Sequence, residues 1–279
     1  MKAVGFIDYY LDEWHANNYP DWINNQSNGE YQVKYAYAAI ESPNADALTN
    51  AQWAEKYSVT LVDSIDKLIE LSDCIIVLSP DDPQMHYELS NKALQSGKPT
   101  YIDKTFSLKG DEAKSIFNIG EKYNSACFSS SALRFSEKLQ QTNRENINSV
   151  ISIGCGEPTN YLIHQLEPIA VLMGTDAKEV MFVGNNNLPA WVIKYDDNKT
   201  AEVHFMKSWC DYTLHINYSD SNQTLVINDD FFKGLIDSII NMFNTNQIPV
   251  EHTQTVGIIK ILETCLKAQN KPFEWVNID

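Results

Sequence analysis

CIIVLSPDDPQMHYELSNKALQSGKPTYIDKTF, residues 74–106, is the stretch that decides the fold. Its first part, residues 74–79, is a continuous apolar run between an aspartate and a proline, which is typical of a strand covered on both faces. Residues 85–97 have the pattern of an amphipathic helix that ends at a glycine, and residues 99–103 favour another short strand. This order predicts a βαβ unit of a parallel sheet.

The same alternation of strands and helices extends on both sides of this stretch. We expect strands over residues 2–8, 32–41 and 125–130, and helices over residues 45–57, 64–71 and 110–123. Residues 17–30 are polar and aromatic and contain many turn formers, so we expect an inserted loop there. The alternation predicts a Rossmann-like parallel-sheet domain over residues 1–126.

The second half of the chain has a different pattern. Short alternating segments favour strands over residues 149–155, 179–185, 191–197, 201–206, 212–219 and 224–229. Two helices are expected to follow, over residues 231–245 and 255–269. We therefore expect an α/β chain whose second domain, residues 127–279, is an α+β domain with an open, largely antiparallel sheet.

Composition and charge narrow the classes of partner. The 279-residue chain has a formal net charge of −16, which disfavours nucleic acids and anionic membranes because both bind clustered lysine and arginine. No apolar run reaches the roughly 18 residues of a membrane span, and the first residues do not resemble a signal peptide. Five scattered cysteines without a CxxC pair favour a reducing cytosol, so we expect a cytoplasmic protein. No pair of histidines has the spacing of a tight metal motif, so no metal is expected.

The stretch from residue 74 to residue 106 also resembles the Gfo/Idh/MocA family of glucose–fructose oxidoreductase, inositol dehydrogenase and their relatives. In that family the corresponding run is a strand, Thr-Pro, a histidine, an Ala-Leu-x-x-Gly-Lys turn and Glu-Lys-Pro. Here the matching residues are Ser79-Pro80, His86, the Ala-Leu-Gln-Ser-Gly-Lys turn and Asp103-Lys104-Thr105. The resemblance implies a Rossmann domain, NAD(H) or NADP(H) as cofactor, and an open second sheet that supports a homodimer or homotetramer.

Lys104 is the first candidate catalytic residue. A lysine at the carboxyl end of a parallel strand lies over the crevice where such sheets bind ligands. Its ammonium group can hydrogen-bond a substrate hydroxyl and also help to hold the nicotinamide. On residue type alone, a solvated surface lysine is the alternative.

Residues 154–174 carry the second part of the resemblance. In the family a helix here carries Asp-x-x-x-His-x-x-Asp, and its histidine acts as general base on the hydroxyl being oxidised. Matching residue by residue places His164 as the base, Asn160 at the supporting aspartate and Glu167 at the later acid. Imidazole suits this work because its ordinary pKa lies near working pH. A buried structural histidine is the alternative.

Pro168 leaves two interpretations of the local structure open. If residues 160–164 are helical, Asn160 and His164 share one face at positions i and i+4. Proline fits poorly inside a helix, so the helix could instead begin near Glu167 with Pro168 in its first turn. His164 would then precede the helix.

The turn after the first strand departs from the dinucleotide pattern. Such folds open with G-x-G-x-x-G, whose glycines let the backbone approach the pyrophosphate. This chain reads DYYLDEWHA over residues 8–16, and no glycine occurs between Gly5 and Gly29. The residues expected to contact a cofactor are Ile7, Asp8, Tyr9, Tyr10, Glu41, Ser79, Pro80, His86 and Lys104. Glu41, after the second strand, would bind the ribose hydroxyls, or else be a solvated acid at a strand end.

Three functions remain open at this point. The first is an NAD(P)-dependent oxidoreductase that transfers a hydride to or from a sugar, cyclitol or similar polyol, with His164 and Lys104 acting on one oxygen. The second is a ligand-binding or regulatory relative that has lost ordinary cofactor binding, and the third keeps NAD permanently bound. The aromatic side chains of Trp14, Tyr19 and Trp22 would either stack on a carbohydrate-like ligand or hold the expected loop against the domain by their burial. His15, His204, His215 and His252 are expected to be structural.

Overall fold

Two compact units make up the computed structural model, which describes residues 1–185 and 187–279. The N-terminal unit consists of Met1–Ser107, Asp111–Ser129 and Leu235–His252. The C-terminal unit consists of Leu108–Gly110, Ser130–Gly234 and Thr253–Asp279. This division differs from a single boundary between residues 126 and 127, because a late segment returns to the N-terminal unit. A pattern read along the chain does not detect such a return.

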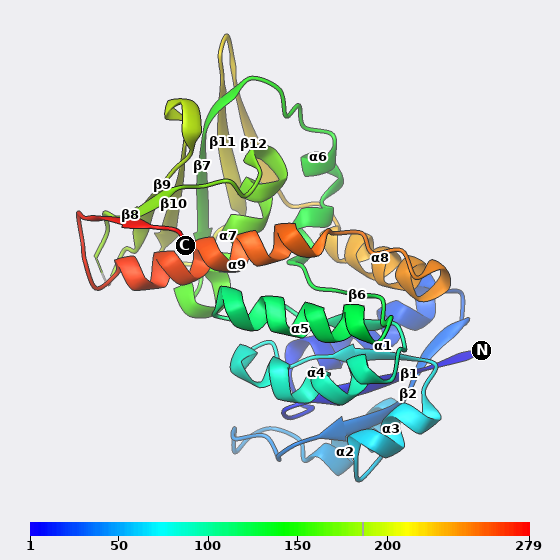
Figure 1. Cartoon of the computed structure of the whole chain (residues 1–279). Helices are drawn as coiled ribbons and strands as arrows, with labels where there is room; N and C mark the ends of the chain where they lie inside the picture. The colour runs from blue at the N-terminus through cyan, green and yellow to red at the C-terminus, as the bar shows by residue number, and fades with distance from the viewer. Residues whose placement is uncertain (186) are drawn as a thin grey trace. The chain divides into compact units, whose positions relative to one another are not determined.

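The N-terminal unit is built on a six-stranded parallel sheet, sheet A (Figure 1). Its strands are β1 (Lys2–Asp8), β2 (Tyr31–Ala38), β3 (Thr60–Leu61), β4 (Cys74–Val77), β5 (Thr100–Ile102) and β6 (Cys127–Phe128). Their order is β3-β2-β1-β4-β5-β6, and each neighbouring pair is parallel. This is the doubly wound order of dinucleotide-binding sheets, so the expected Rossmann-like domain is confirmed.

Most of the helices along the first half of the chain, together with α8, belong to this unit wholly or in large part. They are α1 (Trp14–Gln26), α2 (Asn50–Tyr57), α3 (Ile65–Leu71), α4 (His86–Gln95), α5 (Gly110–Lys122) and α8 (Phe231–Thr245). The apolar run at β4 is completely buried, as its sequence predicts, because helices cover both faces of a parallel sheet. The amphipathic pattern that follows it forms α4 after a short 3-10 turn, Pro83–Met85.

Residues 17–30 are not an inserted loop, and that expectation was wrong. Most of them belong to α1, the crossover helix between β1 and β2. The side chain of Glu13 caps this helix, and Pro20 lies inside it. The asparagines and the proline are poor helix formers, but burial of one face of the helix stabilises it. The buried residues of this face are His15, Ala16, Tyr19 and Ile23. Trp14, Tyr19 and Trp22 are therefore helical residues.

The C-terminal unit is built on a seven-stranded mixed sheet, sheet B. Its strands are β7 (Ile147–Cys155), β8 (Glu179–Phe182), β9 (Ala190–Lys194), β10 (Thr200–Met206), β11 (Tyr212–Tyr218), β12 (Asn222–Ile227) and β13 (Trp275–Asn277). The order is β12-β11-β7-β10-β9-β8-β13, in which β7 and β10 are parallel and the other described pairs are antiparallel. The expected open, largely antiparallel sheet is confirmed.

Helix α7 (Pro158–Met173) covers one face of sheet B. It starts at Pro158 and continues through Pro168, so the alternative of a helix that begins near Glu167 was wrong. Proline suits the first helical position, and Pro168 removes one backbone N–H from the interior. Burial of the helix compensates for that loss, since Leu162, Leu166 and Ile169 are at most 1% exposed. His164 therefore lies within the helix, one turn after Asn160.

The remaining elements of the C-terminal unit are short, apart from one long helix. They are the 3-10 turns Ala132–Phe135 and Asp196–Asn198, α6 (Glu137–Gln140) and α9 (His252–Ala268). Trp191 of β9 is fully buried, and its indole N–H donates to the Cys265 carbonyl of α9 at 2.8 Å. No helix in the described ranges is long and apolar enough to cross a membrane.

Candidate functional site

The N-terminal unit gathers polar residues at the carboxyl edge of sheet A. Asp8 ends β1, the Ser79-Pro80 pair follows β4, and the Asp103-Lys104 pair follows β5. Because β1, β4 and β5 are adjacent and parallel, these residues share one edge. This edge, next to the point where the strand order reverses, is where open α/β sheets bind their ligands.

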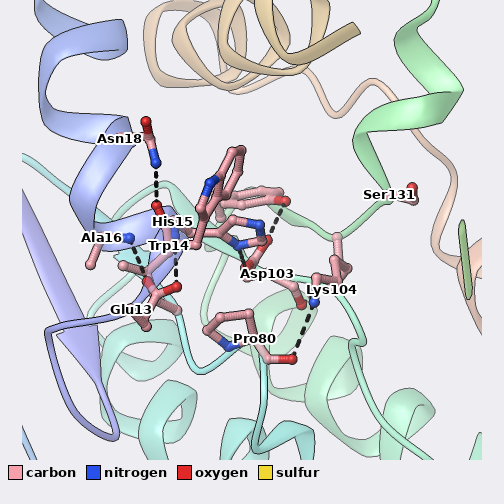
Figure 2. Close-up of polar contacts among 12 residues, drawn as sticks. Glu13, Trp14, His15, Ala16, Asn18, Pro80, Asp103, Lys104 and Ser131 are labelled. Carbon is pink, nitrogen blue, oxygen red and sulfur yellow. Dashed lines mark hydrogen bonds and ion pairs between the residues drawn. The ribbon is translucent and has the colours of Figure 1, made fainter. Parts of the chain in front are cut away.

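Lys104 is held at this edge. It is 7% exposed, and its ammonium group donates a hydrogen bond to the Pro80 carbonyl at 3.2 Å (Figure 2). Ser79 adopts a positive φ of 81°, and its hydroxyl donates to the Asp82 carbonyl at 3.0 Å. The loop after β4 thus positions the lysine that the resemblance places beside the substrate.

Asp103 pairs with His15, which sequence reasoning left as a structural residue. The contact joins an Asp103 carboxylate oxygen to Nδ1 of His15, and both side chains are buried (Figure 2). The Tyr101 hydroxyl donates to the other Asp103 oxygen at 3.0 Å. Burial alone would raise the pKa of Asp103, but His15 and Lys104 hold that pKa below its usual range. Asp103 is therefore an ionised carboxylate that orients the imidazole.

Glu13 occupies the amino end of α1. Its carboxylate accepts hydrogen bonds from the backbone N–H groups of His15, at 2.6 Å, and Ala16 (Figure 2). The residue is 7% exposed. Burial raises the pKa of Glu13 to about 7, against the opposing effects of His15 and the helix amides.

Asp8 lies at the same turn and is 1% exposed. One carboxylate oxygen accepts from the Tyr9 N–H at 2.7 Å, and the other has no hydrogen-bond partner among the described residues. Burial, with the carboxylate of Glu13 next in effect, raises the pKa of Asp8 well above its usual range. Burial thus favours the protonated form of Asp8.

The raised pKa of Glu13 predicts that the free energy of unfolding falls as pH rises. The pKa of Glu13 increases from 4.5 in the unfolded chain to about 7 in the folded one, so the folded state retains the proton between these values. The stabilisation is complete below the lower value and is lost as pH rises through the upper one. We expect a loss of up to about 3 kcal/mol between pH about 5 and about 8, measured by urea unfolding. Glu13→Gln should flatten the profile, and an unchanged slope in that variant would contradict the assignment.

Other expected cofactor residues have roles within the protein. Glu41 is exposed, and its carboxylate accepts from the Asn50 N–H at the start of α2, at 2.7 Å. His86 is completely buried, with Nε2 2.6 Å from the Leu78 carbonyl and Nδ1 3.1 Å from the Phe106 carbonyl. Burial lowers the pKa of His86. It therefore connects the segments that follow β4 and β5.

The aromatic residues of the first turn lie next to each other. The rings of Tyr9 and Tyr10 are 6.1 Å apart, and Ile7 in β1 is fully buried. Burial raises the pKa of Tyr10 to about 12, and Asp81 and Asp82 act in the same direction. Tyr10 thus remains a neutral phenol at working pH.

The C-terminal unit holds the second group of candidate residues. His164 is half-buried on α7, and its Nδ1 lies 2.7 Å from the Ser131 hydroxyl. The rings of Tyr161 and Tyr212 lie 5.4 Å and 5.8 Å from the imidazole. When Nδ1 carries the hydrogen, Ser131 accepts it and Nε2 is the basic nitrogen of the ring. Ser131 was missed, although the serine run that follows β6 is a sequence signal for it.

Glu167 forms a buried ion pair. One of its oxygens lies 2.6 Å from Nε of Arg134, and the other accepts from the Ser131 N–H at 3.4 Å. Glu167 thus contacts the backbone of Ser131, the residue whose hydroxyl lies beside His164. Asn160 lies on the same helix, four residues before His164.

Among the described residues, no group of three or more histidine, cysteine or acidic side chains is placed to hold a metal ion. The charged groups at the edge of sheet A and around α7 are arranged as pairs and hydrogen-bonded carboxyls. What they can do chemically is bind polar oxygens and accept or donate protons.

The two units thus present a doubly wound sheet with a lysine at its ligand edge and a mixed sheet whose covering helix carries a histidine. The model of the Gfo/Idh/MocA family, described as an oxidoreductase family with an NAD-binding Rossmann fold, matches residues 15–131. The expected resemblance is thereby confirmed, and the family description agrees with the expected NAD-type cofactor. The matched range begins at residue 15, in the first turn of α1, and leaves out β1 and residues 8–14.

Solved structures share this fold along the whole chain. GenD2 from gentamicin A biosynthesis, in complex with NAD, has a TM-score of 0.80 at 8% identity, covering 100% of this chain and 97% of that one. The scyllo-inositol dehydrogenase of Lactobacillus casei, with bound NAD(H) and scyllo-inositol, has a TM-score of 0.78 at 13% identity, covering 99% of each chain. A probable dehydrogenase of Thermotoga maritima has a TM-score of 0.80 at 12% identity, covering 99% and 98%. No curated protein sequence matches the chain significantly.

Proposed function

We propose that this protein is an oxidoreductase that acts on a CH–OH group of a sugar, cyclitol or similar polyol. The observation that carries the proposal is Lys104, held by the Pro80 carbonyl at the ligand edge of a doubly wound sheet. NAD(H) or NADP(H), when bound, supplies the hydride chemistry. In the N-terminal unit, Lys104 is the proposed hydrogen-bond donor to a substrate oxygen, and in the C-terminal unit His164 is the proposed proton acceptor or donor.

Two features support a polyol-like substrate. Both candidate catalytic groups, an ammonium and an imidazole, form hydrogen bonds with oxygen, which suits binding of an alcohol. The L. casei relative, similar in fold, is described with bound scyllo-inositol. His164 is bordered by the rings of Tyr161 and Tyr212, and aromatic rings of this kind pack well on the apolar faces of sugars.

The strand order of sheet A and the position of Lys104 suit a dinucleotide. The turn after β1, however, lacks the free backbone N–H groups that usually bind the pyrophosphate. The amino end of α1 is already capped by Glu13. This observation favours a second candidate function, a ligand-binding or regulatory relative without ordinary cofactor binding. The two functions differ in whether the protein turns over a substrate.

Activity assays with a panel of polyols and sugar acids test the proposal. Each compound is supplied with NAD⁺ and then with NADP⁺, and the absorbance of reduced nicotinamide is followed. We expect steady turnover with at least one polyol, abolished by Lys104→Ala. Full activity in that variant would overturn the assignment of Lys104, and binding of a polyol without turnover would support the second candidate.

We also propose that the open face of sheet B forms a homodimer or homotetramer. In β7, Val150 and Ser152 are buried, and Ser152 contacts Gln165 of α7, whereas Ile151 and Ile153 alternate with them on the other face. Light scattering after gel filtration should show an oligomer. Ile151→Lys should yield monomers, whereas Tyr123→Lys in the N-terminal unit should not. A wild-type monomer would contradict this proposal.

A further inference from the structure

The amino end of α1 is the position where a doubly wound sheet ordinarily binds phosphate. The helix follows β1, which lies between β2 and β4 where the strand order reverses. Backbone N–H groups in the first turn of such a helix have no partner within the helix, and the helix dipole favours an anion there. The thirteen residues of α1 make it a full helix with this property.

In this chain the anion is part of the protein. Both carboxylate oxygens of Glu13 are engaged by N–H groups of the first helical turn, those of His15 and Ala16. Glu13 is 7% exposed, so the contact is enclosed. If the first glycine of G-x-G-x-x-G is placed at Asp8, where β1 ends, its third glycine falls on Glu13. The position of that third glycine, which normally lets the helix pack closely on the strand, thus carries a carboxylate that occupies the helix amides.

A second observation points to the same place. The buried carboxyl of Asp8 has one oxygen without a hydrogen-bond partner among the described residues, and the charge of Glu13 acts on it. An unsatisfied polar atom in the interior is costly, so such an atom marks a site that is incomplete or specialised. Asp12 adds a further carboxylate at this turn, where it accepts from the Leu48 N–H at 2.7 Å. A pyrophosphate would therefore meet several carboxyls as well as a closed helix end.

We propose that the Glu13 side chain is a built-in substitute for phosphate, and that its removal opens a phosphate-binding site at the amino end of α1. Wild-type protein then holds any dinucleotide without the usual contact between pyrophosphate and helix. This proposal shares one premise with the proposed function, namely that a cofactor binds at the carboxyl edge of sheet A. The site itself is defined by the contacts of Glu13.

Calorimetric titration with inorganic pyrophosphate tests this directly. Measurements are made at about pH 8, above the pKa of about 7 for Glu13, so that the wild-type carboxylate is charged. Glu13→Gly removes the acceptor and the charge, whereas Glu13→Gln removes the charge and retains an oxygen that can cap the helix. We expect pyrophosphate to bind most tightly to Glu13→Gly, at least about tenfold more tightly than to wild type, with Glu13→Gln between them.

Controls separate this inference from the proposed function. Glu30→Gln makes the same charge change at an exposed position and should leave affinity unchanged. Glu13→Ser, which keeps a capping hydroxyl, replaces the glycine variant if that one does not fold. A wild-type affinity equal to that of the folded Glu13 variants would overturn the proposal. NADH is titrated in parallel with wild type and the same variants. If a Glu13 variant gains pyrophosphate binding but neither it nor wild type binds NADH, only the proposed cofactor is rejected. If wild type binds NADH but no Glu13 variant gains pyrophosphate binding, only the proposal for Glu13 is rejected.

Discussion

His164→Ala is expected to lower kcat by about 10²–10⁴-fold, the usual contribution of a positioned general acid or base. The physical reason is that His164 supplies the titratable nitrogen on α7, oriented by the Ser131 hydroxyl at 2.7 Å. KM should change much less than kcat, because the lost interaction is one made in the transition state. The measurement is steady-state kinetics with the polyol that gives the highest wild-type rate.

Two further variants make this result specific. His204→Ala removes a histidine of the same unit that pairs with Glu202 on β10, and it should retain wild-type turnover. Ser131→Ala tests a positioning residue, since it should lower kcat less than His164→Ala and shift the pH profile of kcat. A His164→Ala enzyme that keeps most of its activity would show that the base lies elsewhere.

Arg134→Ala is expected to lower the free energy of unfolding by about 3–5 kcal/mol, as for other buried ion pairs that lose one partner. The guanidinium group of Arg134 lies 2.6 Å from the Glu167 carboxylate, which is 1% exposed. Removal of the arginine leaves that carboxylate buried without its counter-charge. Urea unfolding, followed by circular dichroism, gives the difference in free energy.

The matched comparison is a replacement of both partners. Arg134→Met combined with Glu167→Met removes both charges and should recover much of the loss, because two apolar side chains require no counter-charge. Lys67→Ala breaks the exposed pair with Glu70, and should cost less than about 1 kcal/mol. An Arg134→Ala cost as small as that of Lys67→Ala would show that the buried pair contributes little.

Local patterns predicted much of the fold. The apolar run at β4 and the amphipathic repeat of α4 are signals contained within a few residues, and the expected helix over residues 231–245 has the observed bounds of α8. The alternating segments of the second half became strands, and in β10 and β11 buried residues occur at every second position. Signals of this kind depend only on the periodicity of burial.

Local patterns failed where a single capping contact or a long-range pair decides the structure. The asparagines and proline of residues 17–30 indicated a loop, but the Glu13 cap and a buried face make this segment helical. The pair of His15 and Asp103 joins residues 88 positions apart, and no periodicity predicts it. Asp103 in place of the family's glutamate and the glycine-free stretch that contains Glu13 were visible in the sequence, but the contacts of these two residues were not.

Binding of NADH to the wild-type protein tests the oxidoreductase assignment directly. Fluorescence of the reduced nicotinamide is followed while the protein is titrated at about pH 7, near the pKa of Glu13. We expect saturable binding of NADH or NADPH, weakened by Lys104→Ala and retained in His204→Ala. Absence of binding for both cofactors at millimolar concentration would contradict the oxidoreductase assignment.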